Sequence, residues 1–385
     1  MNLKKDFHNL SQLEFNNKIA SLKNEKSTIN FFSFDRGYFY YPTVNIVEKI
    51  YELDKKIDIF ISFFNSFDDF SKNQIIQSYL ICELKSTNEI ENIYSTRHDI
   101  VYLMNKIESE NKNSKKIKSL LNAYRSYSNY FQINSLKSIR EAYDKIILPT
   151  LDSKDDYPDG HLFRKNGVDI TNGISIVHKG FSNEEKIILG LEEFIKIYNN
   201  KEINYLLRGL ISHFMFETIH PFYDGNGRLG RYLFSLLLMK EKEYILGLTV
   251  SNAFASNKEK YYKALEVGRS YDQGGCINEY IEECISLLSK KIEESIKELS
   301  SQKEYLDMYV QNNKYTKKEQ LIFKILLSAS KLSIYGISME ELIIYSKSSR
   351  RTIIYALNKF KNHYCIKKQP FGKKVFYSFD LDTFK

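Results

Sequence analysis

Side chains able to bind and transfer a phosphate group are concentrated in one short run, His220-Pro-Phe-Tyr-Asp-Gly-Asn-Gly-Arg-Leu-Gly-Arg231. Its histidine can accept a proton near neutral pH, and the oxygens of Asp224 suit Mg²⁺. Arg228 and Arg231 can each grip a phosphate with several N–H groups. The glycines let backbone N–H groups point into a loop, where they favour an anion. These residue types and spacings indicate a site for a magnesium-bound polyphosphate.

Two helices are expected to position this run. Residues 204–219 carry apolar side chains at the spacing of an amphipathic helix, and Pro221 ends that helix. Residues 229–239 are apolar enough for a second core helix. The run is therefore a tight loop that opens into a helix N-terminus, where the helix dipole favours an anion. A plain glycine turn between core helices is the alternative, but it would need neither His220 nor Asp224.

The run matches, position for position, the signature His-x-Phe-x-(Asp/Glu)-Gly-Asn-Gly-Arg-x-x-Arg, and so resembles the Fic-domain family. The resemblance covers roughly residues 40–290. It implies a mainly α-helical Fic core with a β-hairpin flap. It also implies a protein adenylyltransferase (AMPylator), which transfers AMP from ATP to a Ser, Thr or Tyr hydroxyl of a target protein, with ATP as co-substrate and Mg²⁺ as cofactor.

The resemblance implies a role for each residue of the run. His220 is the general base that takes the proton of the incoming hydroxyl, and Asp224 holds the metal ion. Backbone N–H groups cradle the phosphates, the side chain of Asn226 adds a contact, and Tyr262 lies near the adenine. The expected nucleotide-binding residues are Gly225, Asn226, Gly227, Arg228, Arg231 and Tyr262.

The segment Thr87-Asn-Glu-Ile-Glu91-Asn92 resembles the family's inhibitory motif, (Ser/Thr)-x-x-x-Glu-(Gly/Asn). The resemblance implies that Glu91 pairs with Arg231 and blocks the productive pose of the γ-phosphate, because one arginine does not easily serve a carboxylate and a phosphate together. We therefore expect an autoinhibited enzyme. Two alternatives stay open: Glu91 is an exposed carboxylate at a charged helix end, or it positions a water in a de-AMPylating or bifunctional enzyme.

Residues 168–178 form two short β-branched runs about a glycine-containing turn, which predicts a β-hairpin. The hairpin resembles the family's flap, which docks a target segment by strand addition. A turn that only closes the edge of the fold is the alternative. The expected docking residues are Val168, Ile170, Val177 and His178.

Basic charge gathers at the C-terminal end. Residues 311–385 hold 15 Lys and Arg against 5 Asp and Glu, whereas the whole chain has a net charge of +8. Three helices and two strands predict a winged helix-turn-helix there, which would bind DNA or, equally well, a protein or a second copy of the chain. The helices are expected at 317–328, 338–345 and 349–361, with the strands between 364 and 379. The candidate DNA-binding residues are Arg350, Arg351, Tyr355 and Lys359, with Lys373 and Lys374 on the wing.

The rest of the chain is expected to be mainly helical. Helices are expected at 44–53, 71–85, from about 97, 120–131, 136–147, 184–198, 258–268 and 280–309, with connections at 110–118 and 151–160. These elements divide the chain into an N-terminal helical region with the inhibitory motif (1–125), a Fic catalytic core (126–290), a helical linker (291–314) and the winged helix-turn-helix (315–385).

Composition narrows the class of protein. The four cysteines lack a Cys-x-x-Cys pair, which argues against a disulfide framework or a zinc site. No segment has the length and apolarity to span a bilayer, so we expect a cytoplasmic protein with no membrane partner. His213 and Glu217 are expected to be a packed histidine and a salt bridge or cap. A DNA-binding regulator that uses the Fic domain as a nucleotide sensor is the alternative outside the enzymes, and homo-oligomer formation is left open.

Overall fold

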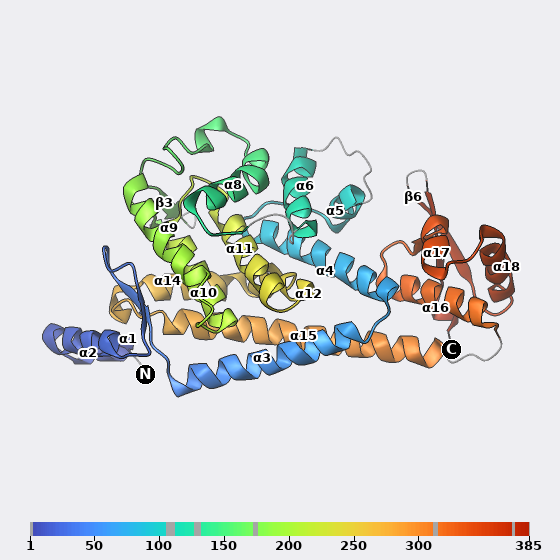
Figure 1. The fold of residues 1–385 in the computed structure, drawn as a ribbon, viewed down its shortest axis with the longest axis horizontal. Coiled ribbons are helices and arrows are strands. Elements are labelled where there is room, and N and C mark those ends of the chain that lie inside the picture. The colour runs from blue at the N-terminus through green and yellow to red at the C-terminus, as the bar shows by residue number, and fades with distance from the viewer. Residues whose placement is uncertain are drawn as a thin grey trace. The chain divides into compact units, whose positions relative to one another are not determined.

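The computed structural model describes residues 3–104, 112–126, 132–171, 176–310, 315–371 and 374–384. The chain divides into two compact units, residues 1–57 with 82–291 and residues 58–81 with 292–385. The sequence analysis divides the chain into four consecutive parts. Each compact unit of the structure instead combines two segments that are separated in the sequence. Most of the described residues are helical, as predicted (Figure 1).

The core of the first unit is a pair of helices, α10 (Tyr205–Ile219) and α11 (Asn226–Glu241), with α9 (Glu184–Tyr198) packed against α10 (Figure 1). Every residue of α10 after the first is buried, including polar ones such as Arg208 and Glu217, so the helix is enclosed on more sides than its amphipathic spacing predicted. The helix α11 begins three residues before the predicted start. Its first turn consists of polar and glycine residues, so no apolar spacing marks it as helical.

Three long helices contribute residues to both units: α3 (Val44–Asn65), α4 (Asp69–Ile90) and α15 (Asn278–Val310). Shorter elements complete the helical part of the first unit. They are α5 (Arg97–Met104), α6 (Lys112–Arg125), α8 (Leu136–Ile146), η1 (Leu148–Thr150), η2 (Lys154–Asp156), α12 (Tyr244–Gly247), α13 (Val250–Ala255), α14 (Lys258–Arg269) and η3 (Tyr271–Gln273).

The helix α6 corrects one sequence prediction. Residues 110–118 were expected as a surface connection because they are rich in Lys and Asn, but the helix already begins at Lys112. Ile117, Leu121 and Tyr124 are buried along one face of it, so packing of that face favours a helix through a polar first turn. The predicted extension of this helix beyond residue 126 lies outside the described residues.

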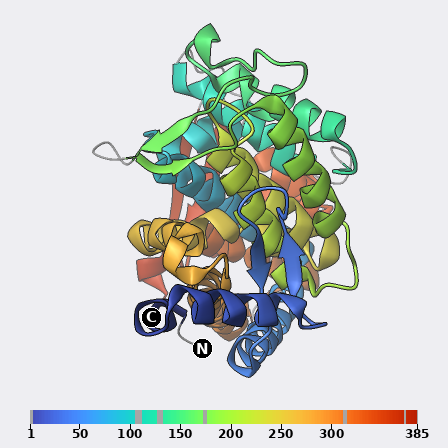
Figure 2. The same cartoon turned by 90° about the vertical axis from the view of Figure 1, so that its left-hand side faces the viewer.

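The N-terminal segment is part of the first unit. Helices α1 (Leu3–Asn9) and α2 (Gln12–Asn24) precede a small hairpin of β1 (Ile29–Phe31) and β2 (Tyr38–Tyr40), paired antiparallel. Figure 2 shows the two helices beside this hairpin, and Phe15, Ile19 and Phe39 share one apolar cluster there. Strands of three residues carry too little alternation to be predicted from the sequence.

The predicted flap is present as a hairpin of β3 (Asp169–Thr171) and β4 (Ile176–Lys179). The strands pair antiparallel, with Asp169 opposite Lys179 and Ile170 opposite His178. The turn at residues 172–175 and the side chains of Ile170 and Val177 lie outside the described part of the chain. A further bond from the N–H of Gly180 to the carbonyl of Val168 (3.0 Å) closes the base of the hairpin.

The second unit holds a small α/β module that is compatible with the predicted winged helix. It comprises α16 (Lys317–Leu332), β5 (Ile337–Ser338), α17 (Met339–Ser346), α18 (Arg350–Phe360), β6 (Ile366–Phe371), β7 (Lys374–Phe379) and η4 (Leu381–Thr383). The strands form an antiparallel sheet in the order β5-β7-β6; β5 was not predicted. Ser338 caps α17.

The candidate DNA-binding residues of this module differ in their surroundings. Arg350, Arg351 and Tyr355 are exposed on α18. The ammonium of Lys359 instead lies 2.9 Å from a carboxylate oxygen of Glu319 on α16, and Lys373 lies outside the described residues. DNA binding stays a prediction, with one cation fewer than expected.

Within the described residues, no helix combines the length and apolarity needed to cross a membrane.

Candidate active site

The motif loop, residues 220–227, is braced from within. Gly225 has a left-handed backbone (φ +81°), and a Cβ at this position would lie 2.2 Å from Cγ2 of Ile147. The Asn226 amide accepts a bond from the N–H of Phe222 (2.9 Å) and donates one to its carbonyl (2.8 Å). The ring of Phe222 is buried and stacks on Tyr143, with centroids 3.6 Å apart. The Asn226 side chain therefore holds the loop closed, and its expected contact with the nucleotide stays a prediction.

The loop leads into a helix N-terminus that no side chain caps. Gly225 occupies the N-cap position of α11, and no side chain accepts a hydrogen bond there. The N–H of Gly225 donates to Oδ1 of Asp224 (2.5 Å). Free N–H groups in the first turn of a helix, together with the helix dipole, favour an anion. The first turn of α11 is thus suited to phosphate oxygens.

His220 lies at the opposite end of the loop, at the C-cap of α10. Its backbone is left-handed (φ 52°, ψ 64°), a conformation that residues other than glycine rarely adopt. Nδ1 of the imidazole is buried and has no hydrogen-bond partner among the described residues. Burial, and then the charges of Arg269 and Arg164, lower the pKa of His220 from 6.5 to about 3. The imidazole is therefore neutral at physiological pH and able to accept a proton.

The low pKa of His220 predicts an unusual pH dependence. An ordinary histidine with a pKa of 6.5 would lose about nine-tenths of its basic form by about pH 5.5. Because the pKa of the folded-state imidazole is lowered to about 3, a reaction that uses His220 as base should keep its rate within about twofold between about pH 8 and about pH 5.5. Steady-state rates in a buffer series measure this. A tenfold fall with an apparent pKa near the ordinary histidine value would contradict it.

Asp224 is the one residue of the loop suited to a metal ion. Its side chain is about half exposed, and Oδ2 lies 3.3 Å from Nη2 of Arg228. No group of three or more His, Cys, Asp or Glu side chains that could hold a metal ion occurs among the described residues. Mg²⁺ commonly takes only one or two protein carboxylates and completes its shell with phosphate oxygens and water. A single open carboxylate at the phosphate loop fits that mode of binding.

The two arginines of the run have separate partners although they share one face of α11. Arg228 is buried and donates from Nη1 to the hydroxyl of Thr150 (2.9 Å). Arg231 is also buried, and its Nη2 lies 2.8 Å from Oε1 of Glu91. Thr87 takes two further bonds from this guanidinium, at its hydroxyl from Nε and at its carbonyl from Nη2 (both 3.0 Å). The inhibitory segment, residues 87–92, thus occupies most of the Arg231 guanidinium.

The carboxylate of Glu91 also lies against the motif loop. A Cβ at Gly227 would come within 2.1 Å of Oε1 of Glu91, so the lack of a side chain at Gly227 makes room for this carboxylate. Burial alone would lower the pKa of Arg231, but Glu91 and other neighbours hold it above the usual value. A carboxylate therefore stands at the loop where the resemblance places an outer phosphate.

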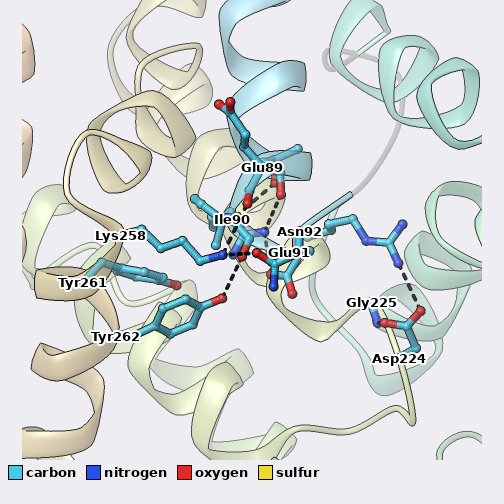
Figure 3. A network of polar contacts seen from close by, with 12 residues as sticks. Glu89, Ile90, Glu91, Asn92, Asp224, Gly225, Lys258, Tyr261 and Tyr262 are labelled. Atoms are coloured by element: carbon cyan, nitrogen blue, oxygen red, sulfur yellow. Dashed lines mark hydrogen bonds and ion pairs between the residues drawn. The ribbon is translucent and has the colours of Figure 1, made fainter. Parts of the chain in front are cut away.

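Residues of α14 fasten the inhibitory segment (Figure 3). Lys258 donates to Oδ1 of Asn92 (2.8 Å) and to the carbonyl of Glu89 (3.3 Å), and the hydroxyl of Tyr262 donates to the carbonyl of Ile90 (3.1 Å). Tyr262 was expected near an adenine, and that role stays a prediction. In this structure its hydroxyl holds the last turn of α4.

Glu83 is a buried anchor of the same helix that the sequence pattern did not single out. Its carboxylate accepts bonds from the N–H groups of Ser251 (2.9 Å) and Asn252 (3.3 Å) in the first turn of α13, and from the hydroxyl of Tyr124 (3.0 Å). Burial raises its pKa above the ordinary glutamate value. A lone acidic residue among the apolar positions of 75–84 was the available signal.

Two residues of α10 were expected to be structural. His213 is packed as predicted, with Nε2 2.8 Å from the hydroxyl of the buried Tyr261. Glu217 forms none of the described ion pairs and caps no helix, because its Oε1 is buried without a hydrogen-bond partner. Burial raises the pKa of Glu217 to about 7. The expected salt bridge or cap was wrong: the charges of Arg231 and Arg269 act on this carboxyl group, but no described ion pair includes it.

The flap residues are placed only in part. Nε2 of His178 lies 2.9 Å from the carbonyl of Thr218 near the end of α10, and burial lowers the pKa of His178 to about 3. The side chain of His178 thus contacts α10, next to the motif loop. Strand addition by a target segment stays a prediction.

Comparison with known proteins agrees with this geometry. Residues 132–238 match the Fic/DOC family. A probable protein adenylyltransferase of Aquifex aeolicus (strain VF5) is 39% identical over 79 residues, which are 20% of this chain and 22% of the relative. A Fido domain-containing protein of Dictyostelium discoideum is 32% identical over 93 residues, 24% of this chain and 61% of the relative. The matches thus span less than two thirds of either relative.

A likeness of fold extends further along the chain. The crystal structure of a Fic family protein from Desulfovibrio desulfuricans G20 covers 88% of this chain and 97% of its own, with a TM-score of 0.59 and 18% sequence identity. At this identity the likeness concerns the fold alone. Residues 132–238, which match the Fic/DOC family, include the motif loop between α10 and α11.

Proposed function

We propose that the protein is an adenylyltransferase that transfers AMP from ATP to a hydroxyl group of a target protein. The observation that carries the proposal is the pairing of a neutral, partly buried imidazole, His220, with an uncapped helix N-terminus across one short loop. A base and an anion site at the two ends of one short loop suit the attack of a hydroxyl on a phosphorus atom. The name of the Aquifex relative, a probable protein adenylyltransferase, supports the same reaction.

The proposed reaction uses residues of the motif loop and of α11. His220 removes the proton of the acceptor hydroxyl, whose oxygen bonds to the α-phosphorus as the bond to pyrophosphate breaks. The N–H groups at the start of α11 stabilise charge on the phosphate oxygens, and Arg228 and Arg231 take the outer phosphates. Asp224 would hold Mg²⁺, which neutralises developing charge on the phosphates.

We further propose that the enzyme is autoinhibited by Glu91. The 2.8 Å contact of its carboxylate with Arg231, and its position against Gly227, support this role. A nucleotide whose outer phosphate needs Arg231 must displace Glu91. Removal of AMP from a target is the alternative activity, because the same carboxylate at the loop is placed to orient a water.

Mass spectrometry of the Glu91→Gly protein, incubated with ATP, Mg²⁺ and a cell lysate, tests the proposal. AMP adducts that appear only with ATP support it, whereas absence of adducts on the enzyme itself and on every lysate protein contradicts it. The AMP-modified target is then incubated with the wild-type and Glu91→Gly proteins. Release of AMP by the wild-type protein alone would favour the de-AMPylating alternative.

Replacement of Asp224 by Asn should weaken the response to Mg²⁺. The loss of one metal-binding carboxylate is expected to lower the rate of AMP transfer by about 100-fold at limiting Mg²⁺, which corresponds to about 3 kcal/mol. Titration of Mg²⁺ at saturating ATP measures the effect. Asp155→Asn is the matched control, because Asp155 is an exposed carboxylate on η2. This variant should show the same Mg²⁺ dependence as the wild-type protein. An unchanged Mg²⁺ dependence in Asp224→Asn would remove the metal-binding role.

A further inference from the structure

Arg164 is a buried arginine that binds the backbone carbonyl of His220 and has no described carboxylate partner. Arg164 is fully buried, and no described ion pair includes it. Its guanidinium donates instead to three backbone carbonyls: Nε to His220 (2.8 Å), Nη2 to Ile219 (3.2 Å) and Nη1 to Asn166. Buried charges in proteins are normally paired with an opposite charge. Arg164 stands beside Phe163 ahead of the hairpin, and nothing in that spacing indicates these contacts.

Two of the carbonyls that the Arg164 guanidinium binds, those of Ile219 and His220, belong to the end of α10. The last carbonyl groups of a helix have no partner within the helix and carry the negative end of its dipole, so a guanidinium is well placed there. The N–H of Arg164 also donates to the carbonyl of Pro221 (3.3 Å). One residue therefore holds three successive carbonyls, those of residues 219, 220 and 221, and the middle one belongs to the left-handed His220.

Arg164 also joins this helix end to the base of the flap. Asn166, whose carbonyl accepts from Nη1, pairs with Asn183 in an isolated bridge just outside the hairpin. On the other side, a Cβ at Gly180 would lie 2.5 Å from Nη2 of Arg164 and 3.1 Å from Cβ of His220. Gly180 thus leaves room for the guanidinium and the imidazole together.

We propose that Arg164 is a positioning residue for His220: it holds the left-handed backbone at the end of α10, and thereby aims the imidazole at the motif loop from the base of the flap. The inference rests on the proposed function, in which His220 is the base. A helix end with a residue in a disfavoured conformation needs such a brace. A small loss of aim is costly to proton transfer, which demands hydrogen-bond geometry.

The charge of Arg164 has a second effect on the same imidazole. Arg164 lowers the pKa of His220, together with burial and Arg269 at the end of α14. His178 on β4 is the other titratable group near the ring, and its own pKa is lowered to about 3. Removal of Arg164 alone should therefore move the pKa of His220 upward while Arg269 remains.

The test uses the full chain with Glu91→Gly as background and compares Arg164→Lys with Arg164→Met. Lysine keeps the charge but cannot reach three carbonyls, so kcat for AMP transfer should fall about 10-fold to 100-fold while KM for ATP stays within about twofold. Methionine should lower kcat at least as much. It should also raise the pKa of His220, measured by NMR of ¹⁵N-labelled histidine and assigned with His220→Gln, whereas lysine should leave this pKa low.

Arg140→Met is the matched control. Arg140 also binds a backbone carbonyl of this segment, that of Leu162 (2.6 Å), but it pairs with Asp144 and does not contact α10. It should leave kcat and the His220 titration unchanged. If Arg164→Met fails to fold, Arg164→Lys still tests the inference, because a fall in kcat with an unchanged KM for ATP would support it.

Unchanged kcat and an unchanged His220 titration in both variants would overturn the inference. A fall in kcat accompanied by falls in ATP affinity and melting temperature would also overturn it, because that pattern indicates a general loss of structure. The proposed function fails separately, if the Glu91→Gly protein with Arg164 intact transfers no AMP. The NMR titration then still decides whether Arg164 governs His220.

Discussion

The Glu91→Gly protein should transfer AMP to itself or to a target about 10-fold to 100-fold faster than the wild-type protein. The substitution removes a charge-assisted bond to the buried Arg231, and such bonds contribute about 1.5–3 kcal/mol, while each 1.4 kcal/mol is about tenfold in population. Arg231 then becomes available to an outer phosphate, although Thr87 still holds part of its guanidinium. Incorporation of labelled AMP from ATP measures the rate.

Glu89→Gly is the matched control for that experiment. Glu89 lies one residue before Ile90 on the same helix, pairs with Lys85 through an exposed side chain, and has no described contact with Arg231. It introduces the same glycine into the same turn, so it reports the cost of a weaker helix end alone. Equal rates for the wild-type, Glu89→Gly and Glu91→Gly proteins would remove Glu91 from any inhibitory role.

Replacement of His220 by Ala in the Glu91→Gly background should abolish measurable AMP transfer. Loss of a positioned general base costs about 10²-fold to 10⁴-fold in rate, and His178 is itself held by the carbonyl of Thr218. ATP binding, measured by calorimetry, should be retained because the helix N-terminus and both arginines are unchanged.

His161→Ala serves as the control for His220. The side chain of His161 is exposed, in the loop before the hairpin, so its removal should change neither rate nor binding. Full transfer activity in His220→Ala would show that the imidazole is not the base. Loss of ATP binding in that variant would assign His220 to the nucleotide instead.

The motif loop was predictable because its chemistry is local in sequence. Eight defined positions between His220 and Arg231 specify a base, a metal ligand, an anion turn and two arginines, and α10 and α9 were predicted because their apolar faces repeat with the helical period. The family's fold followed from the same positions. The pairing of Glu91 with Arg231 was expected from the resemblance, although 140 positions separate the two residues.

Residues whose partners are backbone groups could not be predicted. Arg164 and Glu83 are buried charges bound to carbonyl or N–H groups far away in the chain, and no spacing announces such a contact. Asn226 shows the converse difficulty: its amide suits a nucleotide contact by type, but only the folded loop shows both of its polar atoms bonded to Phe222. Residue type limits what a side chain can bind, and the fold selects the partner.

Glu83 and Glu91 lie eight residues apart near the end of α4, which corresponds to about 12 Å along a helix. The first is fixed by buried bonds to α13, and the second holds Arg231 just beyond the last turn. In the proposed autoinhibition, release of Glu91 requires fraying of the terminal turns against the bonds from Lys258 and Tyr262, a local opening on the nanosecond-to-microsecond timescale. The proposed restraint would then be graded: its basal activity would depend on the helix propensity of residues 84–90 and would rise continuously with temperature.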